Sequence, residues 1–475
     1  MPNEHCWQRI AVAKINIAKI VHALVSLRAD RRGTVAIMMG LLFPVLLAGF
    51  GLGFEISNWY LRTRAMQNAA DAAVIAAASN GEGNYNLEAA AVAAHYGFID
   101  GAGNVAVKAS NNATCPSGAN INPPCYSVTI SSIVPLYLSQ VIGFKGDITV
   151  NGSREKILSS TAIATQTTIQ RPICLLTLSQ TFQGIRTNGA PNSNFSGCTV
   201  MSDSASTCNG SDLQANYGLA SGTNDGCGTL QKSNIPLVAD PYSALASNIP
   251  ANTCGSSATA YPQEPVKNND PPLPSSNTWS GSKSFSGAVQ MCGDIQLTGD
   301  VVINTPDNLT GAVLVIYNGQ LDLNGHTLST ASGSAVTVVF SGDNNGSYEH
   351  ILSDNSTGQG GVFNIQAPRS PSALFPGIAI YQDPSLTSGV DITYNGNNPA
   401  WDITGAVYLP NSNVTMSGDV NKSSNGAACF VMIAYTVLIN GTSNIYAQSP
   451  NGAGCKQAGL NMPTATIPGR SRLVY

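Results

Sequence analysis

Titratable side chains are sparse and scattered in the C-terminal two thirds of the chain. Its histidines and cations include His326, His350, Lys283, Arg369, Lys422 and Lys456. The acids of the same region stand mostly alone, at the starts of apolar runs or in turns: Asp294, Asp300, Asp322, Asp354, Asp383, Asp391 and Asp402. An isolated aspartate in a turn is explained by its hydrogen bonds to nearby backbone groups. A glycosidase needs two carboxylates on either side of one bond, and the sequence gives no sign of such a pair.

Other catalytic signatures are missing as well. The chain has no GxSxG, no HExxH and no phosphate-binding loop. We therefore expect a protein that is not an enzyme, with no catalytic residues, no bound metal and no cofactor.

Cysteines are the other residues with chemistry. Ten of the eleven follow residue 100, and only Cys6 precedes it. None forms a CxxC pair, so we expect no zinc or redox site. An even number of cysteines in an oxidising compartment indicates disulfides. Proximity in the sequence predicts the pairs Cys115–Cys125 and Cys429–Cys455, and leaves the pairing of the middle six open.

A run of apolar residues, 34–54, must anchor these elements. Its 21 residues, TVAIMMGLLFPVLLAGFGLGF, carry no charge, and at about 1.5 Å per residue they span about 30 Å, the core of a bilayer. Arginines stand just before it and Glu55 just after, which places the tail 1–33 in the cytoplasm and the body outside. The alternatives are a core helix, which rarely runs this long without a polar face, and a signal peptide, whose apolar part is shorter.

Charge is distributed unevenly along the 475 residues. The net charge is +4 before Thr34 and −8 after it, and charged residues make up only 10% of the chain. An acidic body argues against binding to nucleic acid. The basic tail, with apolar residues spaced through 10–27, is either an interfacial helix on the inner leaflet or an irregular segment.

Two features of the anchor suggest a partner. Gly49 and Gly53 form a GxxxG spacing, which lets a second membrane helix approach closely. The helical pattern continues through 55–80, where Gln67, Asn68 and Asp71 form a polar patch among alanines. We interpret this patch as a contact surface of the periplasmic helix, with a solvated face as the alternative.

The body divides into two parts. We expect a small α/β domain at 84–168, with helices at 87–98 and 134–142 and strands at 104–109, 127–131 and 148–164. From residue 172 to 475 short β-prone runs end in Gly or Asn, interrupted by a disulfide-rich insertion at about 221–278. Many short runs with few charges favour a right-handed parallel β-helix, and a β-sandwich is the alternative.

The segment around the apolar run resembles the TadE/TadG-like family of Flp (Tad) pilus assembly proteins. The resemblance is carried by Arg-x-Gly before the run, Glu55 at its end, and Met-Gln-Asn-Ala-Ala-Asp-Ala-Ala at 66–73. It implies a single-pass inner-membrane protein with a periplasmic body. A processed pilin-like protein would carry Glu at the fifth position after Gly33, where this chain has Met38, so we expect no processing. Asp203-Ser204-Ala205-Ser206 lacks the first serine of the metal-binding loop that many members carry.

Two functions follow. The first is a non-enzymatic component of a Tad/Flp-type pilus or secretion system, a scaffold or minor pilin-like subunit whose partners are the membrane and other pilin-like subunits. The second is a membrane-anchored carbohydrate-binding or carbohydrate-active protein or adhesin, with a surface glycan as its partner.

Overall fold

The computed structural model describes residues 33–80, 83–116, 125–191, 193–210, 212–255, 261–265, 269–344, 351–352, 361–396, 400–418, 429–441 and 453–474. The expectations for the tail before Gly33 lie outside these residues. The chain separates into two compact units. The first unit contains the chain up to Thr167 and again from Pro468, and the second contains 168–467.

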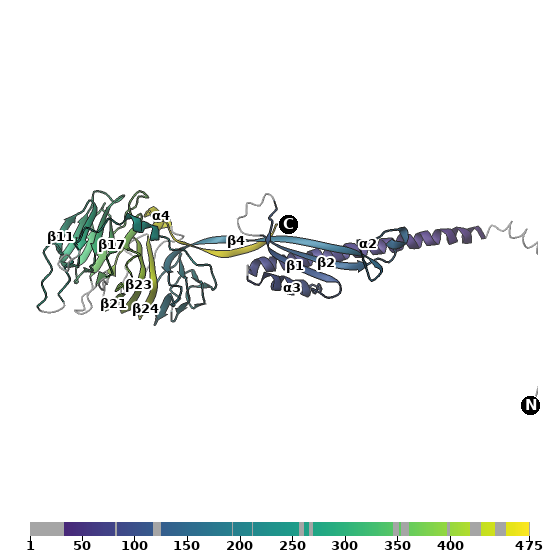
Figure 1. Ribbon diagram of the computed structural model, residues 1–475, viewed down its shortest axis with the longest axis horizontal. Coiled ribbons are helices and arrows are strands. Elements are labelled where there is room, and N and C mark those ends of the chain that lie inside the picture. Colours follow the sequence, from purple (N-terminus) through teal and green to yellow (C-terminus); the bar gives the residue numbers. More distant parts are fainter. Residues whose placement is uncertain are drawn as a thin grey trace, which may run out of the picture. The chain divides into compact units, whose positions relative to one another are not determined.

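The helix α2 (Gly33–Asn80) is the longest element of the first unit (Figure 1). Its 48 residues correspond to about 72 Å at the ordinary helical rise. From Val35 to Phe54 its side chains are almost all exposed. Within the described residues it is the one helix long and apolar enough to cross a membrane, and the mean hydropathy of its most apolar 18-residue stretch is 2.3.

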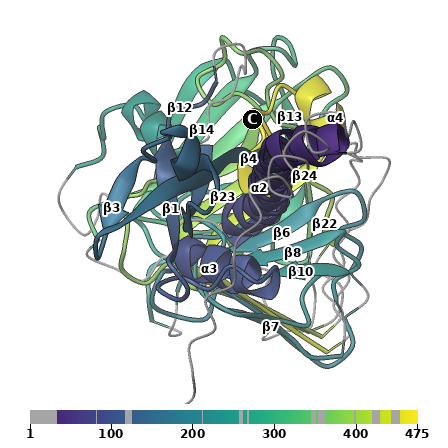
Figure 2. The ribbon, with the colours of Figure 1, turned by 90° about the vertical axis from the view of Figure 1, so that its right-hand side faces the viewer.

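An antiparallel sheet packs on the rest of α2. It contains β1 (Val105–Ala113), β2 (Cys125–Pro135), β3 (Ile148–Val150), β4 (Ser153–Thr177) and β25 (Thr464–Leu473). Strand β2 pairs with β1 and β4, the strands β3 and β4 form a hairpin, and β25 pairs with β4. The helix α3 (Tyr85–His95) also packs against α2 (Figure 2). Both boundaries between the units fall inside strands, one in β4 and one in β25.

Alanines let α2 lie close to this sheet. The buried residues of the helix are Met66, Ala69, Ala70, Ala73, Val74, Ala77 and Ala78. They pack against the inward side chains of β2, which alternate as strand geometry requires: Tyr126, Val128 and Ile130. A row of small side chains at helical spacing thus forms one wall of the unit's core.

Two expectations for this unit are wrong in detail. The predicted helix at 134–142 is a strand as far as Pro135, because the residue before a proline favours extended backbone and Val134 stays paired with β4. Only the single turn η1 (Ser139–Ile142) is helical. The predicted strand at 148–164 is broken by Asn151 and Gly152, whose positive φ angles of 48° and 84° form a hairpin turn.

Parallel strands form the second unit. One ladder contains, in order of pairing, β10 (Leu230–Lys232), β8 (Tyr217–Ala220), β6 (Thr199–Ser202), β4, β24 (Phe430–Asn440), β23 (Gly405–Gly418), β20 (Ile378–Gln382), β17 (Val336–Ser341), β14 (Ala312–Tyr317) and β12 (Gly287–Cys292). Figure 2 shows β6, β8 and β10 one after another.

The second unit contains two further ladders of parallel strands. The first of them shares β23 and β24 with the ladder described above, and the second has strands of its own. One contains β21 (Ile392–Gly396), β23, β24, β5 (Ile185–Asn188), β7 (Ser206–Cys208) and β9 (Asn224–Asp225). The other contains β11 (Thr278–Ser284), β13 (Ile295–Asn304), β15 (Leu321–Asp322), β16 (Thr327–Thr330), β18 (Ile351–Leu352), β19 (Val362–Asn364) and β22 (Ala400–Trp401). A short helix, α4 (Ala453–Gln457), follows β24, where the sequence had indicated only strands.

The stacking order differs from the order of the chain. The chain enters the ladder at β4 and stacks outward through β6 and β8 to β10. It then starts again at β12 and stacks back to β24, which pairs with β4. β24, the last strand of this ladder in the sequence, therefore lies between β4, its first strand, and β23.

The central strands are buried on both faces. In β14, Leu314 and Ile316 belong to one apolar cluster, and Val313 and Val315 belong to another. Residues of the insertion cover the second cluster, among them Ile235 and Tyr242. Burial on both sides explains why these strands are continuously apolar.

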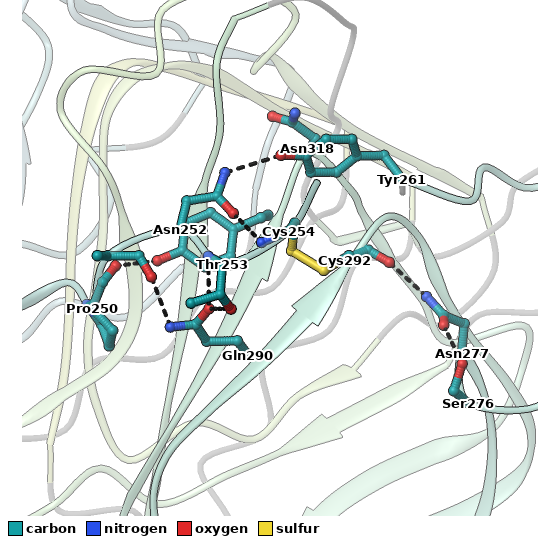
Figure 3. The surroundings of a disulfide bond; sticks show 12 residues. Pro250, Asn252, Thr253, Cys254, Tyr261, Ser276, Asn277, Gln290, Cys292 and Asn318 are labelled. Atoms are coloured by element: carbon teal, nitrogen blue, oxygen red, sulfur yellow. Dashed lines mark hydrogen bonds between the residues drawn. A yellow bond between two sulfur atoms is a disulfide. The ribbon is translucent and has the colours of Figure 1, made fainter. Parts of the chain in front are cut away.

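Five disulfides join ten cysteines: Cys115–Cys125, Cys174–Cys198, Cys208–Cys227, Cys254–Cys292 and Cys429–Cys455. The first and the last are the two pairs that proximity in the sequence predicts. Cys254–Cys292 ties the insertion to β12. Gln290 strengthens the same attachment, since its side chain bonds Thr253 and the carbonyl of Ala251 (Figure 3).

Candidate functional site

The carboxylate of Glu55 lies at the point where the apolar run of α2 ends. It is only 5% exposed. It accepts hydrogen bonds from the backbone N–H groups of Tyr137 (3.0 Å), Leu138 (2.9 Å) and Ser139 (2.8 Å). The hydroxyl of Ser139 donates a fourth, at 3.0 Å.

This arrangement has a simple physical cause. The N–H groups at the start of a helical turn have no partner within the turn, and η1 begins at Ser139. A carboxylate satisfies such donors and suits the positive end of the turn. Glu55 thus acts as a cap supplied by another element, which fastens the segment after β2 to α2. Four donors occupy the oxygens of this carboxylate, so its role in this arrangement is structural.

Two further contacts join α2 to β2 and to the segment after it; we call this region the junction. The side chain of Leu138 lies against Gly51, one turn before Glu55, where a β-carbon would collide with it. Arg62 donates to the hydroxyl of Ser132 on β2 at 2.8 and 3.1 Å. Gly51, Glu55 and Arg62 also line a cleft of about 310 Å³ together with Phe54, Asn58, Trp59, Val134, Pro135, Tyr137 and Leu138.

An aromatic and cationic cluster lies beside the junction. The rings of Trp59 and Phe144 are 6.0 Å apart between centroids. The ammonium of Lys156 lies 5.6 Å from the centroid of each ring and 3.5 Å from the carboxylate of Asp147. Tryptophan and lysine are the side chains that favour the boundary between water and lipid.

The predicted partner face lies on the other side of the helix. Residues Gly49 and Gly53 are two positions before Gly51 and Glu55, which corresponds to a rotation of about 200° around the helix. Among the described residues, a β-carbon at Gly49 or Gly53 would meet no atom within 4 Å other than the backbone of its own helix. The helix is therefore held by its own domain on one side and presents its glycines on the opposite side.

Of the polar patch on α2, Gln67 faces the sheet of the first unit and Asn68 faces outward. Gln67 donates to Asp71 at 2.7 Å and to the carbonyl of Thr161 on β4 at 3.4 Å. Asn68 is exposed. The contact that the structure gives Gln67 is thus internal, and the alanines around it form the core of the first unit.

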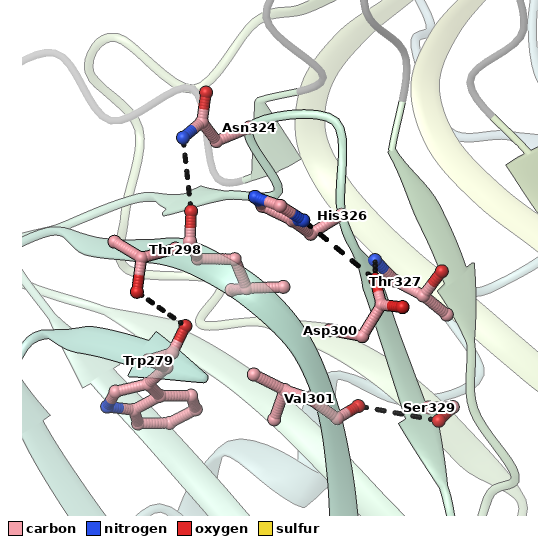
Figure 4. Close-up of polar contacts among 9 residues, drawn as sticks. Trp279, Thr298, Asp300, Val301, Asn324, His326, Thr327 and Ser329 are labelled. Atoms are coloured by element: carbon pink, nitrogen blue, oxygen red, sulfur yellow. Dashed lines mark hydrogen bonds and ion pairs between the residues drawn. The ribbon is translucent and has the colours of Figure 1, made fainter. Parts of the chain in front are cut away.

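Acidic groups in the second unit make structural contacts. Nδ1 of His326 lies 3.9 Å from Asp300, which also accepts the N–H of Thr327 at 2.8 Å (Figure 4). Burial raises the pKa of Asp203 to about 6, against the hydrogen bond from the N–H of Val238 and with a contribution from Asp240. In the part of the chain that the structure describes, no three His, Cys, Asp or Glu side chains are placed to hold a metal.

Buried tyrosines surround Asp240. The hydroxyl of Tyr408 donates to Asp240 at 2.8 Å, and that of Tyr381 donates to the carbonyl of Tyr242 at 3.0 Å. The rings of Tyr381 and Tyr408 stack with centroids 4.8 Å apart. Burial, followed by the charge of Asp240, raises the pKa of Tyr408, so the hydroxyl stays protonated and acts as a donor. This network attaches the insertion to the sheet.

An open hollow of about 650 Å³ lies on the second unit. Its lining is polar apart from Val390 and one aromatic side chain: Thr387, Gly389, Val390, Asp391, Asn411, Asn413 and Tyr435. Asp391 accepts from the backbone and side-chain nitrogens of Asn413 at 2.9 and 3.0 Å. No local pattern in the sequence indicates this grouping, since its members come from segments about 20 residues apart.

The similarity of this chain to a known protein family lies in α2, the helix that carries Glu55. Residues 33–80 match the family of putative Flp pilus-assembly TadE/G-like proteins. The match extends over α2 from its first residue to its last. The crystal structure of the competence-associated pilin ComZ from Thermus thermophilus is similar over 78% of this chain and 88% of that one, at 11% identity and a TM-score of 0.17. A likeness that low supports no argument about fold or function. A comparison with curated proteins finds no match.

Sequence reasoning identified part of the site. Glu55 was visible as the first charge after the apolar run, within the segment that now matches the TadE/G-like family. Its partners were not visible, because Ser139 is 84 positions away and nothing in the sequence relates the two. Gly51 was missed for the same reason.

Proposed function

We propose that this protein is a non-enzymatic component of a Tad/Flp-type pilus assembly or secretion system, anchored by α2 in the bacterial inner membrane and acting as a scaffold or minor pilin-like subunit. The tail before Gly33 lies in the cytoplasm, and the chain after Glu55 lies on the other side of the membrane. The observation that carries the proposal is the coincidence of the TadE/G-like match with one uninterrupted helix.

The construction of α2 supports this role. Its first part is exposed and apolar, and its second part forms the core of the first unit with α3 and the sheet. Because the helix does not break between them, the folded unit starts directly where the membrane segment ends. A protein built in this way transmits the position of a membrane helix to an external domain.

The opposite faces of α2 support a partner in the membrane. Glu55 and Gly51 are in contact with the η1 segment, whereas a β-carbon at Gly49 or Gly53 would meet no side chain of the described residues within 4 Å. Glycines four residues apart allow a second helix to approach closely. The Gly49/Gly53 face is therefore our assignment for the contact with another pilin-like subunit.

We further propose that the second unit is a right-handed parallel β-helix that projects as a scaffold. Parallel pairing from β10 to β12 supports stacked coils, which a β-sandwich of hairpins would not provide. The insertion, held by Cys254–Cys292, covers one side of the stack.

The test replaces Gly49 and Gly53 by leucine and measures co-purification with pilus subunits from the native membrane. We expect the double variant to insert normally and to lose its partners, because added β-carbons meet no described side chain at these positions, whereas leucine blocks the close approach of a second helix. Gly40→Leu is the matched control: Gly40 is exposed and lies about 180° around the helix from Gly49, and no side chain of the described residues lies within 4 Å of an added β-carbon there. Retention of all partners by the double variant would refute the docking face.

Topology is tested separately. We expect alkaline phosphatase fused after Tyr475 to be active and a fluorescent protein at the same position to be dark, since the C-terminus lies outside the cytoplasm in the proposed orientation. The reverse pattern would overturn the placement.

The hollow around Tyr435 favours a second candidate function, binding of a surface glycan. Amides, a carboxylate and hydroxyls converge there beside an aromatic ring, which is the combination that binds sugar hydroxyls and sugar faces. A glycan array probed with the full chain, and with Asn413→Ala as the variant, tests it. Equal signals for both proteins would exclude this hollow as the binding site.

A further inference from the structure

An exposed apolar segment follows β2 in the first unit. In residues 136–144, which we call the η1 loop, Tyr137 is 66% exposed, Val141 is 78% exposed and Ile142 is 64% exposed. Leu138 and Phe144 are also exposed. Contiguous apolar patches of this kind mark a surface that is covered in the working protein.

The contacts of the η1 loop place it at the end of the membrane segment. Glu55, which binds three successive N–H groups of the loop, is the residue directly after the apolar run. Leu138 reaches Gly51, which lies three residues inside that run, or about 5 Å along the helix axis from its last residue. The loop is thus level with the last turn of the segment that crosses the bilayer.

Hydrogen bonding within the loop suits a lipid environment. Val141 donates to the carbonyl of Leu138, Gly143 to that of Gln140, and Phe144 to that of Ser139. The side-chain amide of Gln140 bonds the carbonyls of Leu136 and Tyr137. Backbone groups that are satisfied internally do not have to be stripped of water at a cost when the loop enters an apolar medium.

The surroundings of the loop fit the same depth. Phe144, at its end, packs on Trp59, one turn beyond Glu55, and Lys156 covers both rings. Aromatic rings and lysine ammonium groups collect at the level of lipid headgroups. The exposed apolar side chains of the η1 loop therefore lie between two features: the contact of Leu138 with Gly51 inside the membrane segment, and the aromatic and cationic cluster at the expected level of the headgroups.

We propose that the η1 loop inserts Tyr137, Val141 and Ile142 into the leaflet from which the first unit emerges. The occupant of this surface is the lipid bilayer itself. The unit is then held at the membrane by two points, α2 and the loop, which fixes its height and its rotation about the helix. This inference rests on the membrane anchoring by α2 that the proposed function includes.

The test uses the full chain in vesicles of phosphatidylcholine and phosphatidylglycerol, with Cys6→Ser to remove the cysteine outside the disulfides. A single cysteine replaces Val141 and carries an environment-sensitive fluorophore. Leu87→Cys on α3 is the matched control, because it is equally apolar and 66% exposed in the same unit but lies near the far end of α2. Leu47→Cys reports insertion of the helix itself.

We expect the label at Val141 to shift to shorter wavelength and to lose more than half of its emission when the lipids carry bromine near the headgroup, while the label at Leu87 stays unchanged. Labelling Ile142 instead should give the same result. If Val141 behaves like Leu87 while Leu47 is quenched, the helix is anchored but the loop is not in lipid, and the inference is wrong. If Leu47 is not quenched by lipids that carry bromine in the middle of the acyl chain, the anchoring itself fails. Protection of Val141 only in native membranes that contain the pilus subunits would assign the loop to a protein partner and would also overturn the proposal.

Discussion

The carboxylate of Glu55 accepts the backbone N–H of Ser139 at 2.8 Å, across 84 positions of the sequence. This bond and its three companions join the end of the apolar run of α2 to the segment that follows β2. They fix the position of the η1 loop on α2 within the first unit.

Glu55→Ala should loosen the η1 loop. The change leaves three backbone donors and one hydroxyl without their acceptor, and a buried donor without a partner costs about 1–3 kcal/mol. Partial hydration of the loop reduces the total, so we expect the first unit to lose about 2–4 kcal/mol of its free energy of unfolding. Hydrogen exchange of Tyr137, Leu138 and Ser139 measures it.

The control for that experiment is Glu88→Ala, an exposed acid on α3, which should change stability by less than about 0.5 kcal/mol. Unaltered exchange in the Glu55 variant would show that the carboxylate does not hold the loop.

Gly51→Leu should displace Leu138. Any β-carbon at this position collides with the leucine side chain, so the loop must move away from the helix. We expect faster exchange of the η1 loop in this variant and wild-type exchange in Gly49→Leu, whose β-carbon would meet no atom of the described residues beyond its own helix backbone within 4 Å. Equal behaviour of the two variants would contradict the close approach.

The second unit should lose stability as the pH rises from about 4 to about 6. Burial raises the pKa of Asp203 to about 6, whereas an aspartate in an unfolded chain titrates near 4. Between these values the folded form binds more protons, so the free energy of unfolding falls with rising pH and stays lower above the folded-state pKa.

Asp203→Asn removes this dependence. We expect the variant to match the wild type near pH 4 and to be more stable by about 1–3 kcal/mol at neutral pH. Native-state hydrogen exchange of β6, the strand that precedes Asp203, reports it. Asp225→Asn, at an exposed position, serves as the control. A variant that is less stable at neutral pH would show that the ionised carboxylate is favourable where it lies.

Removing Cys254–Cys292 should release the insertion. The two cysteines are 38 positions apart, and closing a loop of that length corresponds to about 4 kcal/mol in the chain-entropy model. In the Cys254→Ser/Cys292→Ser variant we expect rapid exchange around Tyr242, while the strands beneath exchange as before. Protection of the insertion without the disulfide would mean that the tyrosine network alone suffices.

Local signals in the sequence predicted the local structure well. An uncharged run of 21 residues and an alanine-rich continuation are properties of one segment, and α2 covers both. Likewise, Cys115 and Cys125 are close in sequence, and the structure joins them. The helix expected at 134–142 failed because the pairing of Val134 with β4 outweighs a weak local preference.

Contacts between distant segments were not predictable. Glu55 was recognisable as an unusual charge, but only folding brings η1 to it. The same holds for the hollow at Tyr435, whose residues come from separate strands and their connections.

The sequence by itself determined a long helix able to cross a membrane, a basic N-terminal tail, and an acidic body of short strands. These features follow from hydropathy, charge and periodicity, which act over a few residues at a time. Tertiary structure decided that Glu55 fastens η1, and that β24 pairs with β4 in the middle of the stack. Strands of similar composition have no local feature that specifies their neighbours, so the order of stacking depends on which faces pack together in the complete fold.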